Sequence, residues 1–420
     1  MPPLKIVSDA LLQDLMACGQ ADVVAGVATF NDGSTIARVL DAVLESFATT
    51  LLRERTVVVA ADGGSGDGTL DFVRGTAASD AARPFRHPLR TVHRIAGTYP
   101  GGPSGKIALR LLLSAAELLG ARSLVVIDPA DADLSAAEVT GLAQATFRAG
   151  YDLVMPVLPR APGEGPLVTQ LVRPVVRALW SRRLLEPVGM PFACSGRLAV
   201  DVMRRSPWAQ LPEETTSALW VAAQALAGAW RLGQLALRER RQLAARRGSL
   251  VEIFSGITLT LMECAAQLPG AVLARDGSED VELLAPPPRG LDRQVGIDAE
   301  AEAAAFRSSR ALLEPLWAQI LSPETLAAVV ADSEGAPRLR EDAVWARAVY
   351  EFLLARRRGA MARGQLAGAL LPLYQGRVAS FLASIRDLDA EGVEQRLEAL
   401  AVEFQRQKAA WRSALGPTAR

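Results

Sequence analysis

The sequence predicts an α/β protein, in which helices cover both faces of a sheet and an all-helical region follows. Three observations predict this fold class. Short apolar runs of strand length alternate with stretches of helical periodicity over the first two thirds of the chain. Most of these runs are nearly all apolar, which is typical of parallel strands buried on both faces. Beyond the proline-rich segment at 284–290, only helical periodicity is found.

Six apolar runs are the expected strands. The runs at 22–30 and 56–61 are rich in valine and alanine, and each ends at a polar segment that contains glycine. The run at 123–127 ends directly at Asp128. The other expected strands are 89–95, 153–158 and 232–237. Parallel strands connected by helices bind their ligands beyond the carboxyl ends of the strands, so the residues that follow each run are the candidate site.

Helical periodicity accounts for most of the rest of the chain. Between the expected strands and up to the linker, helices are expected at 34–52, 106–119, 166–184, 215–229 and 249–268. After the linker they are expected at 299–321, 323–332, 341–357, 363–388 and 390–415. The linker predicts two domains, an α/β domain at 1–285 and a helical domain at 286–420.

Composition excludes several classes of protein. The chain has 420 residues, of which 50% are hydrophobic, and Lys+Arg equals Asp+Glu at 46 each. A neutral total argues against a broad nucleic-acid-binding surface. Three scattered cysteines without a CxxC spacing argue against a zinc site or a disulfide framework and fit a reducing compartment. With no apolar run long enough to span a membrane and no signal peptide, we expect a soluble cytoplasmic protein.

Polar residues follow the first two expected strands. Asn31 and Asp32 come after the first, and a segment of aspartate and glycine at 62–68 comes after the second. A carboxylate at a strand end can accept hydrogen bonds from a base or from ribose hydroxyls, and glycine lets the backbone approach a ligand. A tight strand-to-helix turn without a ligand is an equally open interpretation.

Two further residues suit a ligand that carries phosphate. Lys106 opens a helix after a glycine-containing segment at 101–105, a position that favours phosphate. Asp128 ends the most apolar strand and could hold a divalent cation that bridges a diphosphate. An exposed lysine at a turn and an aspartate that caps the next turn are the alternatives.

Six segments of the chain occur in an order typical of one enzyme family. They are GVATFNDGSTIARVL, VVVAADGGSGDGT, SGKIALRLLLSAAELLGARSLVVID, LVRPVVRALW, EPVGMPFACSGRLA and ALWVAAQALAGAWRLGQL. Through these segments the chain resembles the retaining GT-A glycosyltransferases of the glucosylglycerate, glucosyl-3-phosphoglycerate and mannosylglycerate synthase type. WARAVYEFLLA and LLPLYQGRVASFLASIRDL extend the resemblance into the C-terminal region. The resemblance implies a GT-A domain, which is the Rossmann-like fold of nucleotide-diphospho-sugar transferases, followed by an all-α domain.

The same resemblance implies roles for individual residues. Such enzymes transfer a hexose from a nucleotide sugar, a UDP- or GDP-hexose, to a small acid such as glycerate or its phosphate. Asp128 and Lys106 take the catalytic positions. The implied nucleotide-sugar site consists of Thr29, Phe30, Asn31, Asp32, Asp62, Gly63, Gly64, Ser65, Lys106 and Asp128. The candidate acceptor site consists of Arg173, Gly189, Met190, Ser195 and Arg197; for both arginines a structural ion pair is an equally open interpretation.

The chain departs from the family where a metal is expected. Asp128 matches the first aspartate of the family's Asp-x-Asp, but the third position is Ala130. The family's metal-binding histidine falls at about Gln242, and neither histidine of the chain, His87 or His93, is near it. Mg²⁺ and Mn²⁺ are held poorly by one carboxylate, so Asp128 would be a weak metal ligand.

Arginines near the position of the lost histidine offer a replacement for the metal. Arg246 and Arg247 stand there, and guanidinium groups bind phosphate oxygens bidentately. A solvated basic edge is the other interpretation of these arginines. The family's acceptor acid is also replaced, by Met190 and Pro191, and a further acid of the family falls at about Ala218, with Glu213 nearby.

Two functions follow from this pattern. The first is a retaining hexosyltransferase that uses a nucleotide sugar and a small polar acceptor, either with Mg²⁺ or Mn²⁺ or without a metal. The second is a catalytically inactive GT-A protein that binds a nucleotide or a partner. A nucleotidyltransferase is a weaker third candidate, because its glycine-rich, arginine-bearing N-terminal loop is missing. The long C-terminal helices would also allow two copies to form a homodimer.

Overall fold

Two compact units make up the chain. The computed structural model describes residues 7–76, 93–238, 249–286, 296–333, 336–337, 339 and 341–415. The contacts group Met1–Leu158, Val188–Arg247 and Glu282–Pro287 into the first unit. Pro159–Pro187, Gly248–Val281 and Pro288–Arg420 form the second. These contacts group residues 159–187 and 248–281 with the C-terminal region. The single domain boundary expected between 285 and 286 stays a prediction.

An eight-stranded sheet is the centre of the first unit, and it confirms the α/β prediction. Its order is β10-β8-β5-β7-β4-β1-β2-β3. The strands are β1 (Val23–Thr29), β2 (Thr56–Asp62), β3 (His93–Thr98), β4 (Ser123–Ile127), β5 (Leu153–Val157), β7 (Phe192–Ser195), β8 (Leu232–Ala236) and β10 (Glu282–Leu283). Residues of β1, β2, β4 and β5 are buried almost throughout, as their continuous apolar sequences predict.

One strand makes the sheet mixed, where the apolar runs predicted a parallel one. β7 lies between β4 and β5 and is antiparallel to both. Its four residues, Phe192–Ser195, are too few for periodicity to distinguish a strand from a loop, which is why the sequence did not reveal it. The remaining neighbours in the sheet are parallel.

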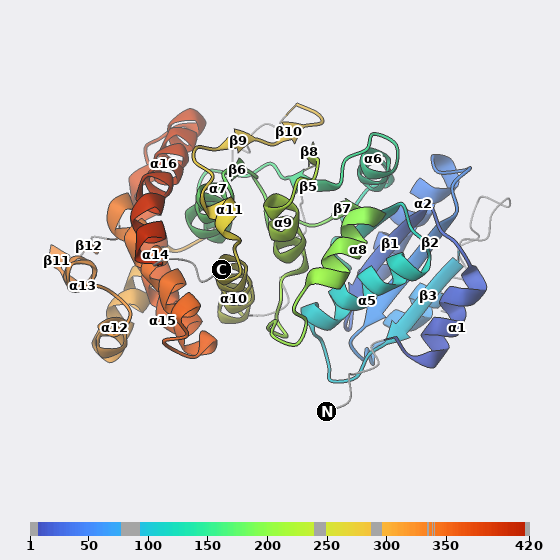
Figure 1. Ribbon diagram of the computed structural model, residues 1–420, viewed down its shortest axis with the longest axis horizontal. Coiled ribbons are helices and arrows are strands. Elements are labelled where there is room, and N and C mark those ends of the chain that lie inside the picture. The colour runs from blue at the N-terminus through green and yellow to red at the C-terminus, as the bar shows by residue number, and fades with distance from the viewer. Residues whose placement is uncertain are drawn as a thin grey trace. The chain divides into compact units, whose positions relative to one another are not determined.

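Helices cover both faces of this sheet (Figure 1). Side chains of α2 and α6 pack with residues of β1, β2 and β4 in one core. On the other face α5 approaches β1 closely, because a Cβ at Gly26 would lie 3.0 Å from the side chain of Leu112. The helices of the unit are α1 (Asp9–Cys18), α2 (Ile36–Thr49), α3 (Thr69–Arg74), α5 (Gly105–Leu118), α6 (Ala136–Phe147), α8 (Gly196–Arg205) and α9 (Ser217–Ala227).

The second unit is mainly helical, which confirms the all-α prediction for the C-terminal region. It contains η1 (Val168–Val172, a π-helix), α7 (Arg173–Trp180), α10 (Leu250–Ala266), α11 (Gly270–Leu273), α12 (Ala299–Trp317), α13 (Pro323–Val330), α14 (Asp342–Arg358), α15 (Arg363–Ile385) and α16 (Ala390–Ala414). Two-residue strands form two small sheets, β6 (Arg182–Arg183) with β9 (Glu279–Asp280) and β11 (Asp332–Ser333) with β12 (Ala336–Pro337). Within the described residues, no helix is both long and apolar enough to cross a bilayer.

A buried ionic cluster holds several helices of the second unit together. The guanidinium of Arg377, on α15, is fully buried and lies 2.7 Å from Asp342 Oδ1 at the start of α14. It also donates to Gln170 Oε1 at 3.0 Å and to the carbonyl of Leu339 at 3.1 Å. Arg396, on α16, binds the same Asp342 carboxylate through two nitrogens at 2.6 and 2.7 Å. Removal of Asp342 would therefore leave a buried cation without its anion.

Candidate functional site

The predicted nucleotide residues lie together where four adjacent strands of the first unit end. β1 pairs in parallel with β2 and with β4, and β2 pairs in parallel with β3. The register sets Thr29 opposite Asp62 and Asp62 opposite Thr98. Asp128 follows β4 at the same edge, since Ile127 is opposite Val27. The carboxyl edge of β4-β1-β2-β3 therefore collects residues from four loops, as the strand pattern predicts.

The loop after β1 is tied to the loop after β2 by side-chain hydrogen bonds. Asn31 N–H donates to Ser65 Oγ at 2.9 Å, and Asn31 Oδ1 accepts from the N–H of Gly66 at 2.9 Å. Asp32 is fully buried, and its N–H donates to Thr69 Oγ1 at 2.8 Å. The two loops thus form one framework, in which Asn31 is exposed and Asp32 is not.

Asp62 organises this framework from beneath. Its carboxylate is fully buried and accepts hydrogen bonds from Thr29 Oγ1 at 2.9 Å and from Ser65 Oγ at 2.5 Å on Oδ1. On Oδ2 it accepts the N–H groups of Gly64 at 2.8 Å and Ser65 at 2.9 Å. A carboxylate has about four acceptor positions, and these four donors fill them. The structure thus gives Asp62 a loop-ordering role; of the two residues whose N–H groups it binds, Gly64 is exposed and Ser65 is half-buried.

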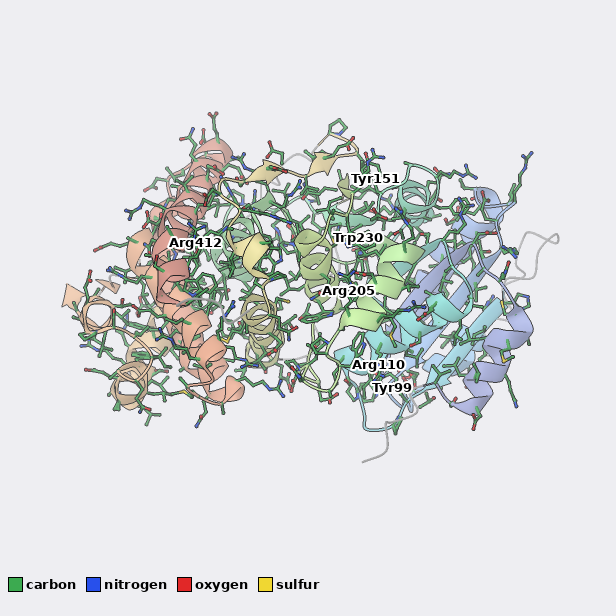
Figure 2. All side chains as sticks on the ribbon, viewed as in Figure 1. Tyr99, Arg110, Tyr151, Arg205, Trp230 and Arg412 are labelled. Atoms are coloured by element: carbon green, nitrogen blue, oxygen red, sulfur yellow. The ribbon has the colours of Figure 1, made fainter. Side chains whose placement is uncertain are left out.

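The third loop lies directly against the second. A Cβ at Gly63 would lie 3.0 Å from Pro103 Cα and 3.3 Å from the hydroxyl of Tyr99, so only glycine allows this approach without displacement. The Tyr99 hydroxyl, labelled in Figure 2, accepts the N–H of Ser104 at 3.2 Å and donates to its carbonyl at 3.3 Å. Burial raises the pKa of Tyr99. This contact fixes the start of α5 beside the loop that Asp62 orders.

Lys106, in the first turn of α5, has a partner that sequence spacing did not predict. Its ammonium forms an ion pair with Glu213 and donates to the carbonyl of Leu211 at 3.3 Å. Glu213 also accepts from Ser104 Oγ at 2.7 Å. Glu213 lies between α8 and α9, far from Lys106 in sequence, and no local pattern indicates that the two meet.

Asp128 does not form a metal site with other described residues. Its Oδ1 accepts the N–H of Ala130 at 2.9 Å, so the position where the resembling family has a second aspartate supplies only backbone. No group of three or more His, Cys, Asp or Glu side chains within the described residues could hold a metal ion. Mg²⁺ and Mn²⁺ require several oxygen ligands. The described donors at this edge therefore do not fit such an ion.

The arginines expected to replace the metal fall on a segment outside the described residues. Arg246 and Arg247 both belong to it, so their role stays a prediction. The last described residue before this segment is Arg238, which follows β8 and is exposed. Its N–H donates to Glu138 Oε1 at 2.9 Å, in the first turn of α6.

The predicted acceptor residues of the first unit are separated by β7. Gly189 and Met190 precede β7, whose first residue, Phe192, is opposite Val126 near the end of β4. Ser195 ends β7 opposite Ser123, the first residue of β4, and is therefore at the other edge of the sheet. Gly189 and Met190 thus lie on the side of Asp128, whereas Ser195 does not.

Ser195 and Arg197 have a structural role at that opposite edge. Ser195 Oγ accepts the N–H of Leu198 and donates to Asp152 Oδ1 at 2.8 Å, and Arg197 donates to the same oxygen at 2.9 Å. Asp152 immediately precedes β5, so this group begins α8 and β5. We therefore do not assign these two residues to an acceptor.

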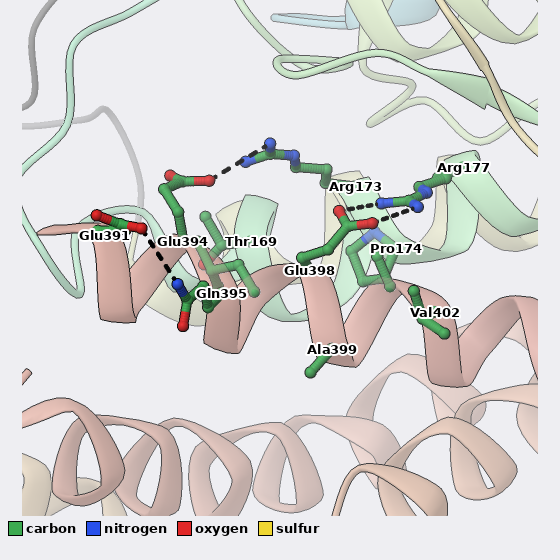
Figure 3. Close-up of a pocket in the computed structure, with 12 residues that line it drawn as sticks. Thr169, Arg173, Pro174, Arg177, Glu391, Glu394, Gln395, Glu398, Ala399 and Val402 are labelled. Atoms are coloured by element: carbon green, nitrogen blue, oxygen red, sulfur yellow. Dashed lines mark hydrogen bonds and ion pairs between the residues drawn. The ribbon is translucent and has the colours of Figure 1, made fainter.

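Arg173 belongs to the second unit and lines a cavity of about 620 Å³ between α7 and α16 (Figure 3). Burial is the main cause that lowers the pKa of Arg173, and its guanidinium lies 3.9 Å from Glu394, beyond hydrogen-bond distance. The neighbouring Arg177 is instead bound by Glu398 through two hydrogen bonds of 2.5 and 2.7 Å. Of the two arginines that line this cavity, Arg173 therefore lies farther from its carboxylate partner than Arg177 does.

Comparisons with known proteins give distant structural likenesses. No family model matches the chain, and no curated protein matches it. Glucosyl-3-phosphoglycerate synthase from Mycobacterium tuberculosis, solved with Mn²⁺, UDP and glucosyl-3-phosphoglycerate, is 19% identical; the match covers 64% of this chain and 87% of that chain, with a TM-score of 0.41. Its complex with Mn²⁺, UDP-glucose and phosphoglyceric acid gives the same identity, coverage and TM-score. A structure described as a mycobacterial protein is 19% identical over 64% of this chain and 82% of that chain, at 0.42. Likenesses this distant do not assign an activity to the chain.

Proposed function

We propose that the first unit binds a nucleotide sugar at the carboxyl edge of β4-β1-β2-β3 and transfers its hexose, with retention of configuration, to a small acid. The observation that carries the proposal is the convergence of four loops at this edge, with Thr29, Asn31, Asp62 and Ser65 in one hydrogen-bonded framework. Such an edge is where open α/β sheets bind nucleotides.

The exposed groups of this edge suit the parts of a nucleotide sugar. The exposed Asn31 and the half-buried Ser65 offer polar groups for a base or ribose, while Asp62 holds the backbone of Gly64 and Ser65. Lys106, in the first turn of α5, supplies a positive charge for the diphosphate. The site thereby offers polar recognition and charge stabilisation, the contributions a sugar transfer requires from the protein.

The reaction proposed here needs no nucleophile from the protein. The bond between the sugar's anomeric carbon and the diphosphate breaks, and the acceptor hydroxyl forms its bond on the same face of the sugar. The proton of that hydroxyl passes to an oxygen of the departing diphosphate. Because the described donors do not fit Mg²⁺ or Mn²⁺, we assign stabilisation of the diphosphate to Lys106 and leave Asp128 the task of orienting the loop after β4.

Donor binding should depend on Lys106 and not on a divalent cation. Replacement of Lys106 by methionine is expected to weaken binding of UDP-glucose, GDP-glucose or GDP-mannose by about 10- to 100-fold, the value of a hydrogen bond to a charged group. Isothermal titration calorimetry, with Mg²⁺ or Mn²⁺ and then with EDTA, measures this. Equal affinities for wild type and Lys106→Met, or binding abolished by EDTA, would contradict the proposed role.

Hexose transfer should require a small acid as acceptor. Release of UDP or GDP from the donor is expected to rise with the concentration of glycerate or 3-phosphoglycerate, and chromatography of the nucleotide measures it. Release that is the same with and without either acid would contradict a small-acid acceptor. A role of Arg173 in binding the acid stays a sequence-based prediction, because Arg173 belongs to the second unit and lines a cavity of that unit.

A second function is favoured by one specific observation. Lys106 is paired with Glu213, which offsets its positive charge. Because position 130 is alanine, it also supplies no carboxylate to hold a cation. Both features reduce the positive charge available to a diphosphate. A catalytically inactive protein that binds a nucleotide would show donor binding in calorimetry but release neither UDP nor GDP from any donor. Chromatographic detection of the released nucleotide, with and without the two acids, separates the two functions. UDP-glucose and phosphoglyceric acid are the first pair of substrates to test in this assay, because the glucosyl-3-phosphoglycerate synthase complex was solved with both.

A further inference from the structure

Lys106 is bound by a carboxylate of its own unit. Glu213 forms the ion pair with its ammonium, and the other oxygen of the same carboxylate accepts from Ser104 Oγ at 2.7 Å. The backbone of Glu213 is also held in place. The Glu213 carbonyl accepts two hydrogen bonds of 3.2 Å, one from the N–H of Lys106 and one from Ser104 Oγ. A Cβ at Gly105 would lie 2.3 Å from the carbonyl oxygen of Thr215, so the backbone of this segment is seated directly on α5.

We infer that Glu213 is an internal anion that competes with the ligand for Lys106 and must be displaced before a diphosphate binds. This inference rests on the proposed function, because it takes Lys106 as the group that receives the diphosphate. Lysine carries a point charge, which a carboxylate and a phosphate oxygen satisfy in the same way. The ammonium has three N–H donors, of which Glu213 and the carbonyl of Leu211 occupy two, but a phosphate oxygen on the third would lie next to the Glu213 carboxylate. The repulsion between the two anions therefore makes them compete for Lys106.

The two partners differ in exposure, which decides which one moves. The side chain of Lys106 is 15% exposed and that of Glu213 is 58% exposed. Lys106 is also held by the carbonyl of Leu211. Rotation of the Glu213 side chain would break its hydrogen bond with Ser104 Oγ but would carry the carboxylate into water, which supplies replacement donors. The hydrogen bonds of the Glu213 carbonyl do not depend on that rotation. Displacement is thus a movement of one side chain over a fixed backbone.

Pyrophosphate binding to the full chain tests the competition. Glu213→Gln keeps the size of the side chain and removes its charge, and it is expected to bind pyrophosphate about two- to fivefold more tightly than wild type, the value of a partly exposed ion pair. Glu214→Gln removes the same charge from the exposed neighbouring residue and is expected to change affinity much less. In a Lys106→Met background, Glu213→Gln should have no effect. Equal gains from Glu213→Gln and Glu214→Gln, or no gain from either, would overturn the inference.

Acylation of lysine gives a second readout that does not require a nucleotide. The chain has three lysines, Lys5, Lys106 and Lys408, so labelling of each is resolved by peptide mass. Lys106 is expected to be acylated faster in Glu213→Gln than in wild type, and pyrophosphate should protect it. Lys408 is the internal reference, because it is buried and donates to Ser181 Oγ and to the carbonyl of Arg275.

The outcomes separate this inference from the proposed function. If UDP- and GDP-hexoses bind none of the proteins but Glu213→Gln gains pyrophosphate affinity, the proposed function fails and the competition stands. If wild type binds a nucleotide sugar through Lys106 and Glu213→Gln changes neither pyrophosphate affinity nor the labelling of Lys106, the competition is wrong.

Discussion

Replacement of Asp62 by alanine is expected to weaken nucleotide-sugar binding by at least about 100-fold. The buried carboxylate accepts four hydrogen bonds, from Thr29, from Gly64 and twice from Ser65. Hydrogen bonds to a charged group contribute about 1.5–3 kcal/mol each, and alanine leaves their donors without an acceptor. The loop after β2 and, through Ser65, Asn31 would lose the geometry that the ligand needs. Calorimetry with UDP- and GDP-hexoses measures the loss.

Asp22 provides the matched control for this variant. It precedes β1 at the opposite edge of the sheet, where its carboxylate binds the side chain of Arg55 at 3.2 Å. This hydrogen bond is the main cause that lowers the pKa of Asp22. Asp22→Ala is expected to leave nucleotide affinity unchanged. If both variants lose affinity equally, the loss reports general destabilisation and not the loop that Asp62 orders.

Replacement of Asp342 by alanine is expected to destabilise the second unit by about 3–5 kcal/mol, the usual cost of leaving a buried charge without its partner. Arg377 is fully buried, and burial lowers its pKa to about 10. Asp342 neutralises both Arg377 and Arg396, so one substitution removes the anion for two guanidinium groups. Chemical denaturation of the full chain, followed by circular dichroism, gives the change in the free energy of unfolding.

An exposed ion pair of the same unit shows what a surface interaction contributes. Arg347 and Glu324 pair across α14 and α13, and the side chain of Glu324 is 76% exposed. Glu324→Ala is expected to cost less than about 1 kcal/mol. Joint replacement of Asp342 by leucine and Arg377 by methionine should recover much of the stability lost in Asp342→Ala, because the fully buried guanidinium is then removed together with its carboxylate. A small effect of Asp342→Ala alone would show that Arg377 finds another counter-charge.

Long elements with strong periodicity were predictable from the sequence. The run at 123–127 is β4 itself, and the helix expected at 363–388 is α15, Arg363–Ile385. Burial on both faces of a strand, or on one stripe of a helix, leaves a pattern that can be read along the chain. The π-helix before Arg173 and the short antiparallel β7 were not predictable. Their conformation follows from packing, not from a local pattern.

The position of the candidate site was predictable, but the partners of its residues were not. Thr29 and Asp62 end β1 and β2, and Asp128 follows β4, so a parallel arrangement brings them to one edge. No local sequence pattern indicates that the Asp62 carboxylate accepts hydrogen bonds from its own loop, because the donors are backbone N–H and hydroxyl groups whose positions depend on the turn. The pairing of Lys106 with Glu213 depends on how the segment before α9 crosses α5, which only the tertiary structure determines.

Hydrogen exchange of the full chain, with and without a saturating UDP- or GDP-hexose, tests the central claim most directly. The proposed function predicts slower amide exchange in the three loops at residues 29–33, 62–68 and 101–107, with no change around Ser195 and Arg197 at the opposite sheet edge. Protection confined to the second unit, or no protection anywhere at a donor concentration that saturates binding, would contradict the assignment of the nucleotide sugar to this edge.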